Sequence, residues 1–163
     1  MAKFQIPSYV SLYAAMSVIP KGKVLFSKMV CLKAPFFSSI SPLVNELNPN
    51  YCEVLMSNHR AVRNHLGIVH AIAMCNMAEL AGGLMTDATV PTTHRWIPKG
   101  MTVEYLKKAD TDLKAIGTPL AALDLSKPSE FPAQVEVFNT AGELVFRAKI
   151  AMWVTPKKSF VRI

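Results

Sequence analysis

The sequence has few cysteines, no long apolar run and a shortage of acidic residues. Its three cysteines, Cys31, Cys52 and Cys75, lie far apart and form neither a CxxC pair nor a zinc-ligand spacing. We interpret them as small buried side chains in a reducing compartment, and we expect the cytoplasm. No window approaches the roughly eighteen apolar residues of a membrane-spanning helix. The apolar stretch near the N-terminus is interrupted by serines and lacks a cleavage site, so no signal peptide is expected either.

The shortage of acidic residues leaves a net charge of +7, from 18 basic and 11 acidic side chains. No run of five or six like charges occurs, which argues against a basic tail that binds nucleic acid. No motif interleaves aromatic and basic residues, so a nucleic-acid or membrane-surface binder ranks low. A basic surface still favours anionic partners, including small molecules that carry phosphates. The alternative is an ordinary solvated basic surface.

The length of 163 residues, with 51% hydrophobic and 18% charged residues, fits one domain with a real core. No internal repeat is visible. We expect a single domain over residues 1–163, with a helical extension at 1–34 and a core at 40–155. In the extension, Val10, Tyr13 and Met16 recur at helical spacing up to Pro20. A second helix follows over 24–32 and must end before Pro35, and residues 35–39 form an aromatic connector.

The rest of the chain is a series of strands interrupted by one long helix. The turn residues Asn48-Pro49-Asn50 separate expected strands at 40–48 and 51–60. Further strands are expected at 100–108, 112–118, 133–139 and 143–155, the last two joined by a short hairpin.

The helix is expected over 68–86, where it would be about 28 Å long. It is apolar on nearly all sides, which is typical of a buried helix, although Gly82-Gly83 weakens its last turn. This order predicts an α+β fold in which an antiparallel sheet wraps around the helix. The open edges of such a sheet favour a homodimer, with a tetramer as the alternative.

The residues with chemical potential precede this helix and lie on it. Asn64, Gly67 and His70 stand where the chain enters the helix. The first turn of a helix has unpaired N–H groups and a partial positive charge, which can hold a carbonyl oxygen as it gains negative charge. Glu79 follows His70 by nine residues, about two and a half turns further along the helix. A carboxylate in so apolar a helix is costly unless it has a partner or a task.

The pattern Asn64-x2-Gly67-x2-His70-Ala71-x7-Glu79 resembles the signature of hotdog-fold acyl-CoA thioesterases of the phenylacetate-pathway type. The segments 78–83 and 95–109 resemble a largely uncharacterised bacterial hotdog subfamily, and the similarity spans about residues 20–155. The resemblance implies a hotdog fold and hydrolysis of an acyl-CoA thioester.

The resemblance also implies roles for single residues. Glu79 would activate water or attack the thioester, the Ala71 N–H would polarise its carbonyl, and Asn64 would lie near the carbonyl or the water. Gly67 and His70 match the family's Gly and His. Ala71 and Ile72 replace the family's glycine pair, and no Ser or Thr near Pro98 matches the residue that assists the water in some relatives.

Coenzyme A carries phosphates at one end, which gives the basic residues near the signature a candidate role. We expect the acyl chain in an apolar slot beside the central helix, covered at one end by the N-terminal helices. The expected substrate-binding residues are Arg60, Arg63, Arg95 and Lys99 for the phosphates, and Met74 and Met77, with Leu80 and Leu84, for the acyl chain. The four histidines have no ligand spacing, so we expect no metal, and no cofactor beyond the coenzyme A thioester as substrate.

Alternatives remain open for each of these assignments. Glu79 has the alternative of a structural carboxylate paired across a dimer. His70 has that of a hydrogen-bonded structural histidine, and Asn64 that of a helix cap. For the whole protein, the alternative to a thioesterase is a non-catalytic acyl-CoA or lipid-binding module on the same fold.

Overall fold

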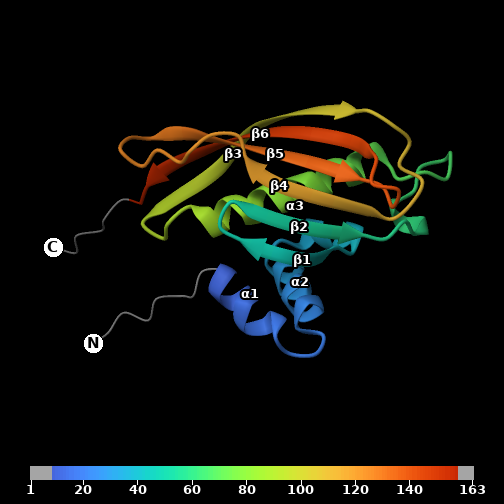
Figure 1. Ribbon diagram of the computed structural model, residues 1–163, viewed down its shortest axis with the longest axis horizontal. Coiled ribbons are helices and arrows are strands. Elements are labelled where there is room, and N and C mark those ends of the chain that lie inside the picture. The colour runs from blue at the N-terminus through green and yellow to red at the C-terminus, as the bar shows by residue number, and fades with distance from the viewer. Residues whose placement is uncertain (1–8, 158–163) are drawn as a thin grey trace.

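The computed structural model describes residues 9–157. The chain begins with two helices and a 3-10 helix, followed by the strands and the long helix (Figure 1). In chain order the elements are α1 (Tyr9–Ser17), α2 (Gly22–Lys33), η1 (Pro35–Ile40), β1 (Leu43–Asn48), β2 (Tyr51–Met56), η2 (Arg60–Val62), α3 (Ala71–Thr89), β3 (His94–Tyr105), β4 (Leu113–Pro119), β5 (Ser129–Phe138) and β6 (Leu144–Pro156).

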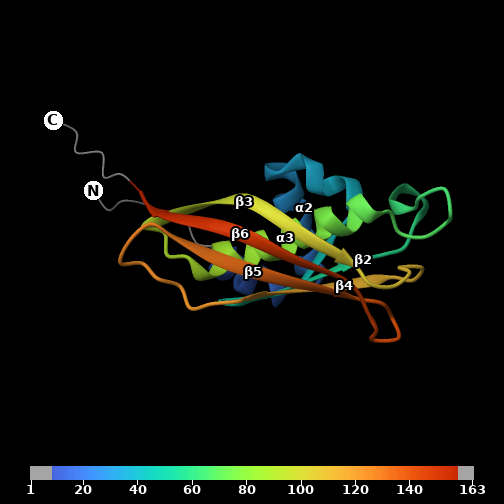
Figure 2. The same ribbon diagram turned by 90° about the horizontal axis from the view of Figure 1, so that it is seen from above.

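All six strands form one antiparallel sheet in the order β1-β2-β4-β5-β6-β3. Helix α3 lies along the inner face of this sheet, while α1 and α2 lie beside β1 (Figures 1 and 2). The predicted α+β class, with a sheet around one long helix, is therefore confirmed. No helix within residues 9–157 is both long and apolar enough to cross a membrane.

The strands of the sheet centre alternate between the core and the outer face, as a sheet with one covered face must. In β5 the buried positions are Phe131, Ala133, Val135 and Val137. Strand β3 differs, because none of its residues is buried and it pairs only with β6. One edge of β3 therefore carries backbone groups that no other strand within residues 9–157 pairs, and such an edge is open to pairing with another copy.

Small residues let α3 approach the sheet closely. A Cβ added at Gly117 of β4 would lie 2.9 Å from the Ala81 carbonyl oxygen of α3, and one added at Gly82 would lie 2.9 Å from the Ile150 side chain of β6. Larger side chains, including Met77 and Met85, fill the space on either side and are fully buried. The glycines thus set the distance between helix and sheet.

Helices α1 and α2 are fixed to β1 by an aromatic cluster and two hydroxyl groups. Tyr13 meets the fully buried Phe26 edge-on, with ring centroids 5.1 Å apart, and its hydroxyl donates to the Asn45 carbonyl. The Ser27 hydroxyl donates to the Lys23 carbonyl and accepts from the Val44 N–H, both at 2.8 Å. This segment is thereby part of the packed molecule. The predicted extension before Tyr9 lies outside the described residues.

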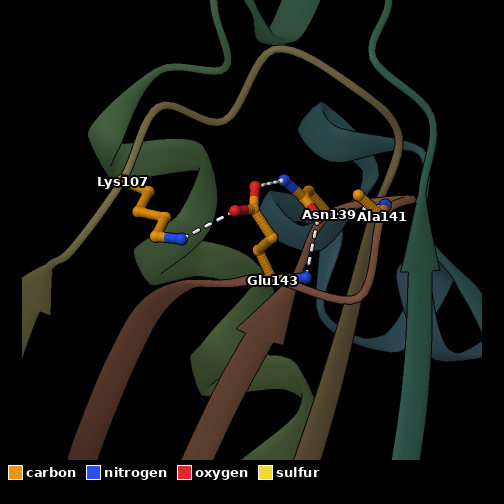
Figure 3. A network of polar contacts seen from close by, with 4 residues as sticks. All are labelled: Lys107, Asn139, Ala141 and Glu143. Atoms are coloured by element: carbon orange, nitrogen blue, oxygen red, sulfur yellow. Dashed lines mark hydrogen bonds and ion pairs between the residues drawn. The ribbon is translucent and has the colours of Figure 1, made fainter.

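A polar network ties the end of β3 to the β5–β6 hairpin (Figure 3). The Glu143 carboxylate accepts from Lys107 at 2.7 Å and from the Asn139 amide at 2.9 Å. The Asn139 side-chain oxygen in turn accepts from the N–H groups of Ala141 and Glu143. The hydrogen bond from Lys107 holds the pKa of Glu143 below its ordinary value. Lys107, one of the cations near the sequence signature, is thus engaged in an ion pair.

Most predicted elements are confirmed, and the differences have physical causes. The long helix begins at Ala71, because residues 64–70 form a tight loop, and it continues past Gly82-Gly83 to Thr89. Strand β3 begins at His94 and runs through Pro98, which an edge strand tolerates at a bulge. The aromatic connector is the 3-10 helix η1. The expectation of a helix buried on nearly all sides is wrong for one stripe, because Ile72 and Glu79 are exposed.

Replacing Gly117 with Ala is expected to lower the free energy of unfolding by about 1–3 kcal/mol, because the new Cβ overlaps backbone atoms that cannot move aside. Urea unfolding of both proteins measures the difference. Gly100→Ala is the matched control, since a Cβ there meets nothing within 4 Å. Equal stability of the two variants would show that the helix–sheet spacing is not set at Gly117.

Candidate functional site

The loop before α3 is closed by the side chain of Asn64. Its Oδ1 accepts from the N–H groups of Leu66 at 2.9 Å and Ile68 at 3.3 Å. Its backbone N–H donates to the Ile68 carbonyl, and Gly67 completes the turn at φ 78°, a conformation that favours glycine. The spacing Asn64-x2-Gly67 thus has a local structural reason. Asn64 caps this loop rather than the helix.

His70 is the N-cap of α3. Its Nδ1 accepts from the Ile72 N–H at 3.0 Å, and its backbone carbonyl accepts from Ala73 at 3.0 Å. The cap requires a lone pair on Nδ1, so the neutral ring carries its proton on Nε2. The ring itself is exposed. These contacts give His70 the structural role that the sequence left open beside a chemical one.

The cap leaves one donor of the first turn free. Ile72, Ala73 and Met74 each donate to His70, but the Ala71 N–H donates to no other residue between 9 and 157. Ala71 is the first residue of α3, where a free N–H and the partial positive charge of the helix end coincide. The predicted oxyanion donor is therefore available for hydrogen bonding.

Glu79 lies on a stripe of α3 together with the exposed Ile72 and the half-buried Cys75. Its carboxylate forms no hydrogen bond or ion pair within the described part of the chain. The Cys75 Sγ lies 3.3 Å from the Tyr105 hydroxyl of β3, a contact that raises the pKa of Tyr105 to about 12. The stripe is thus bordered by β3 on one side, and its carboxylate is unengaged.

Two cavities open beside α3. The first, here the Glu79 pocket, has a volume of about 140 Å³ and lies among α1, α2, η1, α3 and β3. Besides Glu79 its walls include Val30, Phe37, Leu80, Gly83, Leu84 and Trp96. The second, the His70 pocket, has about 200 Å³ and lies over the start of α3, with Phe36, Arg63, His70, Ile72 and Asn76 among its walls. A larger cavity of about 570 Å³ lies on the outer face of the sheet and contains none of the predicted residues.

Asn76 is a buried polar residue at the wall of the His70 pocket. The Ser39 hydroxyl donates to the Phe36 carbonyl at 2.8 Å, so its oxygen is left to accept from the Asn76 amide at 3.0 Å. This fixes the orientation of the amide and leaves Asn76 Oδ1 buried without a partner among the described residues.

The four predicted phosphate-binding cations fall into two groups. Arg60 and Arg63 lie on the loop before α3, where Arg63 is held by two hydrogen bonds of 2.9 Å to Asn58. Arg95 and Lys99 lie on β3 and contact Thr155 and Trp153 of β6. The Lys99 ammonium is 4.4 Å from the centre of the Trp153 ring, a cation–π contact. One chain does not bring the two groups together.

The predicted acyl-chain residues also divide. Met74 and Met77 are buried in the core, whereas Leu80 and Leu84 line the Glu79 pocket. Sequence reasoning missed two further residues of this pocket, Trp96 and Asp87. The Trp96 Nε1–H donates to Asp87 Oδ1 at 3.3 Å, and burial raises the pKa of that carboxyl. The only sequence signal for this pair is Gly83, a glycine inside a helix, over which Trp96 packs.

Replacing His70 with Ala is expected to lower the free energy of unfolding by about 1 kcal/mol, because the Ile72 N–H loses its acceptor. His70→Asn supplies a capping oxygen and is expected to keep the wild-type stability, as thermal unfolding would show. In the activity assay described below, we expect the Asn variant to remain active. Loss of turnover in a stable Asn variant would assign proton transfer to His70.

The chain matches one family model, described as a domain of unknown function, DUF4442, over residues 22–154. No curated protein matches it in sequence. A crystal structure of the structural-genomics protein APC5556 is 43% identical, with a TM-score of 0.79 over 91% of this chain and 99% of that chain.

Two further crystal structures share the fold at low identity. The thioesterase HI1161 of Haemophilus influenzae is 12% identical, with a TM-score of 0.72 over 85% of this chain and 94% of that one. The protein PA5026 of Pseudomonas aeruginosa, described as a probable thioesterase, is 20% identical, with a TM-score of 0.72 over 85% and 97%. The predicted hotdog fold is thereby confirmed, and the chain belongs to the DUF4442 family.

Proposed function

We propose that the protein is an acyl-CoA thioesterase. The observation that carries the proposal is the pairing, on one helix, of a free N–H at Ala71 with an exposed carboxylate at Glu79 that has no partner in the described chain. An apolar pocket opens at this carboxylate. The thioesterase names of structural neighbours support the same class of reaction.

In the proposed reaction, the Ala71 N–H donates to the thioester carbonyl oxygen. Water attacks the carbonyl carbon while Glu79 takes its proton, and the tetrahedral oxyanion is held by the same N–H. The intermediate collapses as the carbon–sulfur bond breaks. The coenzyme A thiolate then takes up the proton, and the products are a carboxylic acid and a thiol. A direct attack by Glu79 would instead form an acyl-enzyme anhydride, which water then hydrolyses.

We further propose that two copies share each site. Glu79 follows Ala71 by eight positions, which places them about 12 Å apart along the helix axis. Catalytic contacts require reacting atoms within about 3.5 Å and oxyanion donors at about 3 Å. A homodimer paired through the open edge of β3 would let Glu79 of one protomer work with the partner's Ala71. It would also bring Arg60 and Arg63 of one copy closer to the partner's β3, where the second group of cations lies.

The second candidate function is a non-catalytic acyl-CoA-binding module in the cytoplasm. The observation that favours it is Ile72, which replaces a glycine of the family signature and leaves its side chain 57% exposed beside the helix N-terminus. A branched side chain there narrows the approach to the Ala71 N–H. Tight acyl-CoA binding without thiol release would distinguish this function from the first.

Two substitutions test the proposed base and the proposed oxyanion donor. Glu79→Gln is expected to reduce thiol release from acyl-CoA substrates about 10²–10⁴-fold, because the base is lost. Ala71→Pro is expected to lower kcat about 10²–10³-fold, because it removes the N–H. Proline suits the first helical position, and His70, at ψ 139°, already has the extended backbone that a following proline requires.

Ala71→Gly keeps the N–H and serves as the matched control, which is expected to retain turnover. A panel of short, long and aromatic acyl-CoAs, assayed by thiol release, measures all three variants. Full activity of Ala71→Pro would remove the oxyanion role from this position. If the wild-type protein binds acyl-CoA but turns over no member of the panel, the result would support the second candidate function, a non-catalytic acyl-CoA-binding module.

Mixing the two inactive variants tests whether two copies share each site. Glu79→Gln and Ala71→Pro, each inactive alone, are mixed under conditions that allow subunit exchange. In a mixed dimer with shared sites, one site combines an intact Glu79 with an intact Ala71 N–H. Random exchange should then restore about a quarter of the wild-type activity. No recovery, despite mixed dimers detected by differential tagging, would place both groups of each site in one chain.

A further inference from the structure

We propose that the Glu79 pocket receives the acyl group and that Trp96, packed over Gly83, sets the longest chain it accepts. The acyl groups that fit are short, of about five or six carbons, or a single phenyl ring. This inference rests on the proposed thioesterase function and names its substrate class.

The pocket is lined in part by the candidate catalytic carboxylate and is otherwise mainly apolar. Glu79 is part of its lining, and the other walls come from α2, η1 and α3, with Val30, Phe37, Leu80 and Leu84 among them. Tyr9 of α1 also contributes, so the N-terminal helices form one side of the pocket. An acyl chain whose carbonyl lies at Glu79 can therefore enter apolar surroundings at once, which favours burial of its methylene groups.

The size of the pocket limits the chain. Its volume is about 140 Å³. A cavity of about 150 Å³ in another protein holds one benzene molecule, so the space suffices for about six carbons. The helix gives a similar limit, because Gly83 follows Glu79 by four residues, or about 6 Å along the axis. Since an extended chain advances roughly 1.2 Å per bond, about five bonds reach the level of Gly83.

Trp96 closes the pocket at that level. A Cβ at Gly83 would lie 3.2 Å from Trp96 Cη2, so the ring lies directly over the glycine. Asp87, one turn further along α3, accepts a hydrogen bond from Trp96 Nε1–H at 3.3 Å and so helps to fix the ring. Burial of Asp87 raises its pKa, as expected for a carboxyl enclosed together with the indole.

Another cavity lies beyond the indole. Its volume is about 340 Å³, and Val90, Pro91, His94, Arg95 and Lys157 contribute to its walls. Trp96 and Asp87 line both this cavity and the Glu79 pocket. The Trp96 ring and its Asp87 partner therefore stand between them. Truncating Trp96 would join the two spaces and extend the room for an acyl chain.

The test measures kcat/KM for straight-chain acyl-CoAs from acetyl to dodecanoyl, and for phenylacetyl-CoA. The wild type is expected to have a higher kcat/KM for chains from butyryl up to hexanoyl, and for phenylacetyl-CoA, than for decanoyl-CoA. Trp96→Ala is expected to raise the ratio of decanoyl to butyryl kcat/KM about tenfold or more, since each methylene group accommodated in an apolar pocket contributes about that much. Trp96→Phe, a smaller change to the packing, should move the ratio in the same direction.

Gly83→Ala tests the opposite direction. The added methyl occupies the contact with Trp96 and is expected to move the preference toward shorter chains. Trp153→Ala is the matched control. This second tryptophan lies on β6, packs against Lys99 of β3 and lines neither the Glu79 pocket nor the His70 pocket. Any effect through Lys99 would change kcat/KM for all chain lengths alike, so the decanoyl-to-butyryl ratio of kcat/KM should stay at the wild-type value.

The outcomes separate this inference from the proposed function. Turnover with the same chain-length ratio in the wild type, Trp96→Ala, Trp96→Phe and Gly83→Ala would overturn the inference and leave the thioesterase intact. If no protein turns over any thioester, the same ratios are measured as dissociation constants by calorimetry. A Trp96-dependent shift in binding would then support the acyl pocket while the proposed catalysis fails.

Discussion

The close contact between α3 and the concave face of the sheet is the constraint on which the rest of the structure depends. Gly117 and Gly82 bring the two backbones together, and apolar side chains from the central strands fill the interface. A helix held on one side by a curled sheet has an opposite side that the sheet does not reach. In this chain α1 and η1 cover part of it, and the stripe with Ile72 and Glu79 remains open. The chemistry proposed for the protein lies in that opening.

The exposed stripe of α3 adjoins β3, the strand at the edge of the sheet. Every residue of β3 is at least partly exposed, and Tyr105 connects that strand to Cys75 beside the stripe. In a monomer water solvates the Glu79 carboxylate and the free Ala71 N–H, and either group would be costly to bury without a partner. A second copy that pairs through β3 would enclose them together. The need to complete the sheet and the need to complete the site thus have one proposed solution.

Hydrophobic periodicity and turn residues predicted the helices, most strands and the α+β class, because burial on a single face leaves a regular trace in sequence. Strand β3 was predicted to begin at residue 100 and not at His94, since Pro98 argues against a strand unless its edge position is known. At the candidate site, the spacing of Asn64, Gly67, His70 and Glu79 indicated the segment in which the structure places the helix N-cap and an unpaired carboxylate. It did not separate the local roles of Asn64 and His70, which close a loop and cap a helix, from chemical ones. Nor did it indicate Trp96, whose partners Gly83 and Asp87 are neighbours only after folding.

The two adjacent glycines of α3 show how fold and specificity are combined in one turn. Each costs about 1 kcal/mol of helix stability relative to Ala, so the pair by itself weakens the helix. Consecutive residues point about 100° apart, and here they meet different neighbours: Gly82 faces Ile150 and Val135 of the sheet, whereas Gly83 faces Trp96. The helix persists because packing on both sides offsets the cost. Gly82 lets the sheet pack closely against the helix, and Gly83 makes room for the indole that closes the proposed pocket. The glycine pair, which by itself weakens the helix, therefore lies where the core ends and the proposed substrate pocket begins.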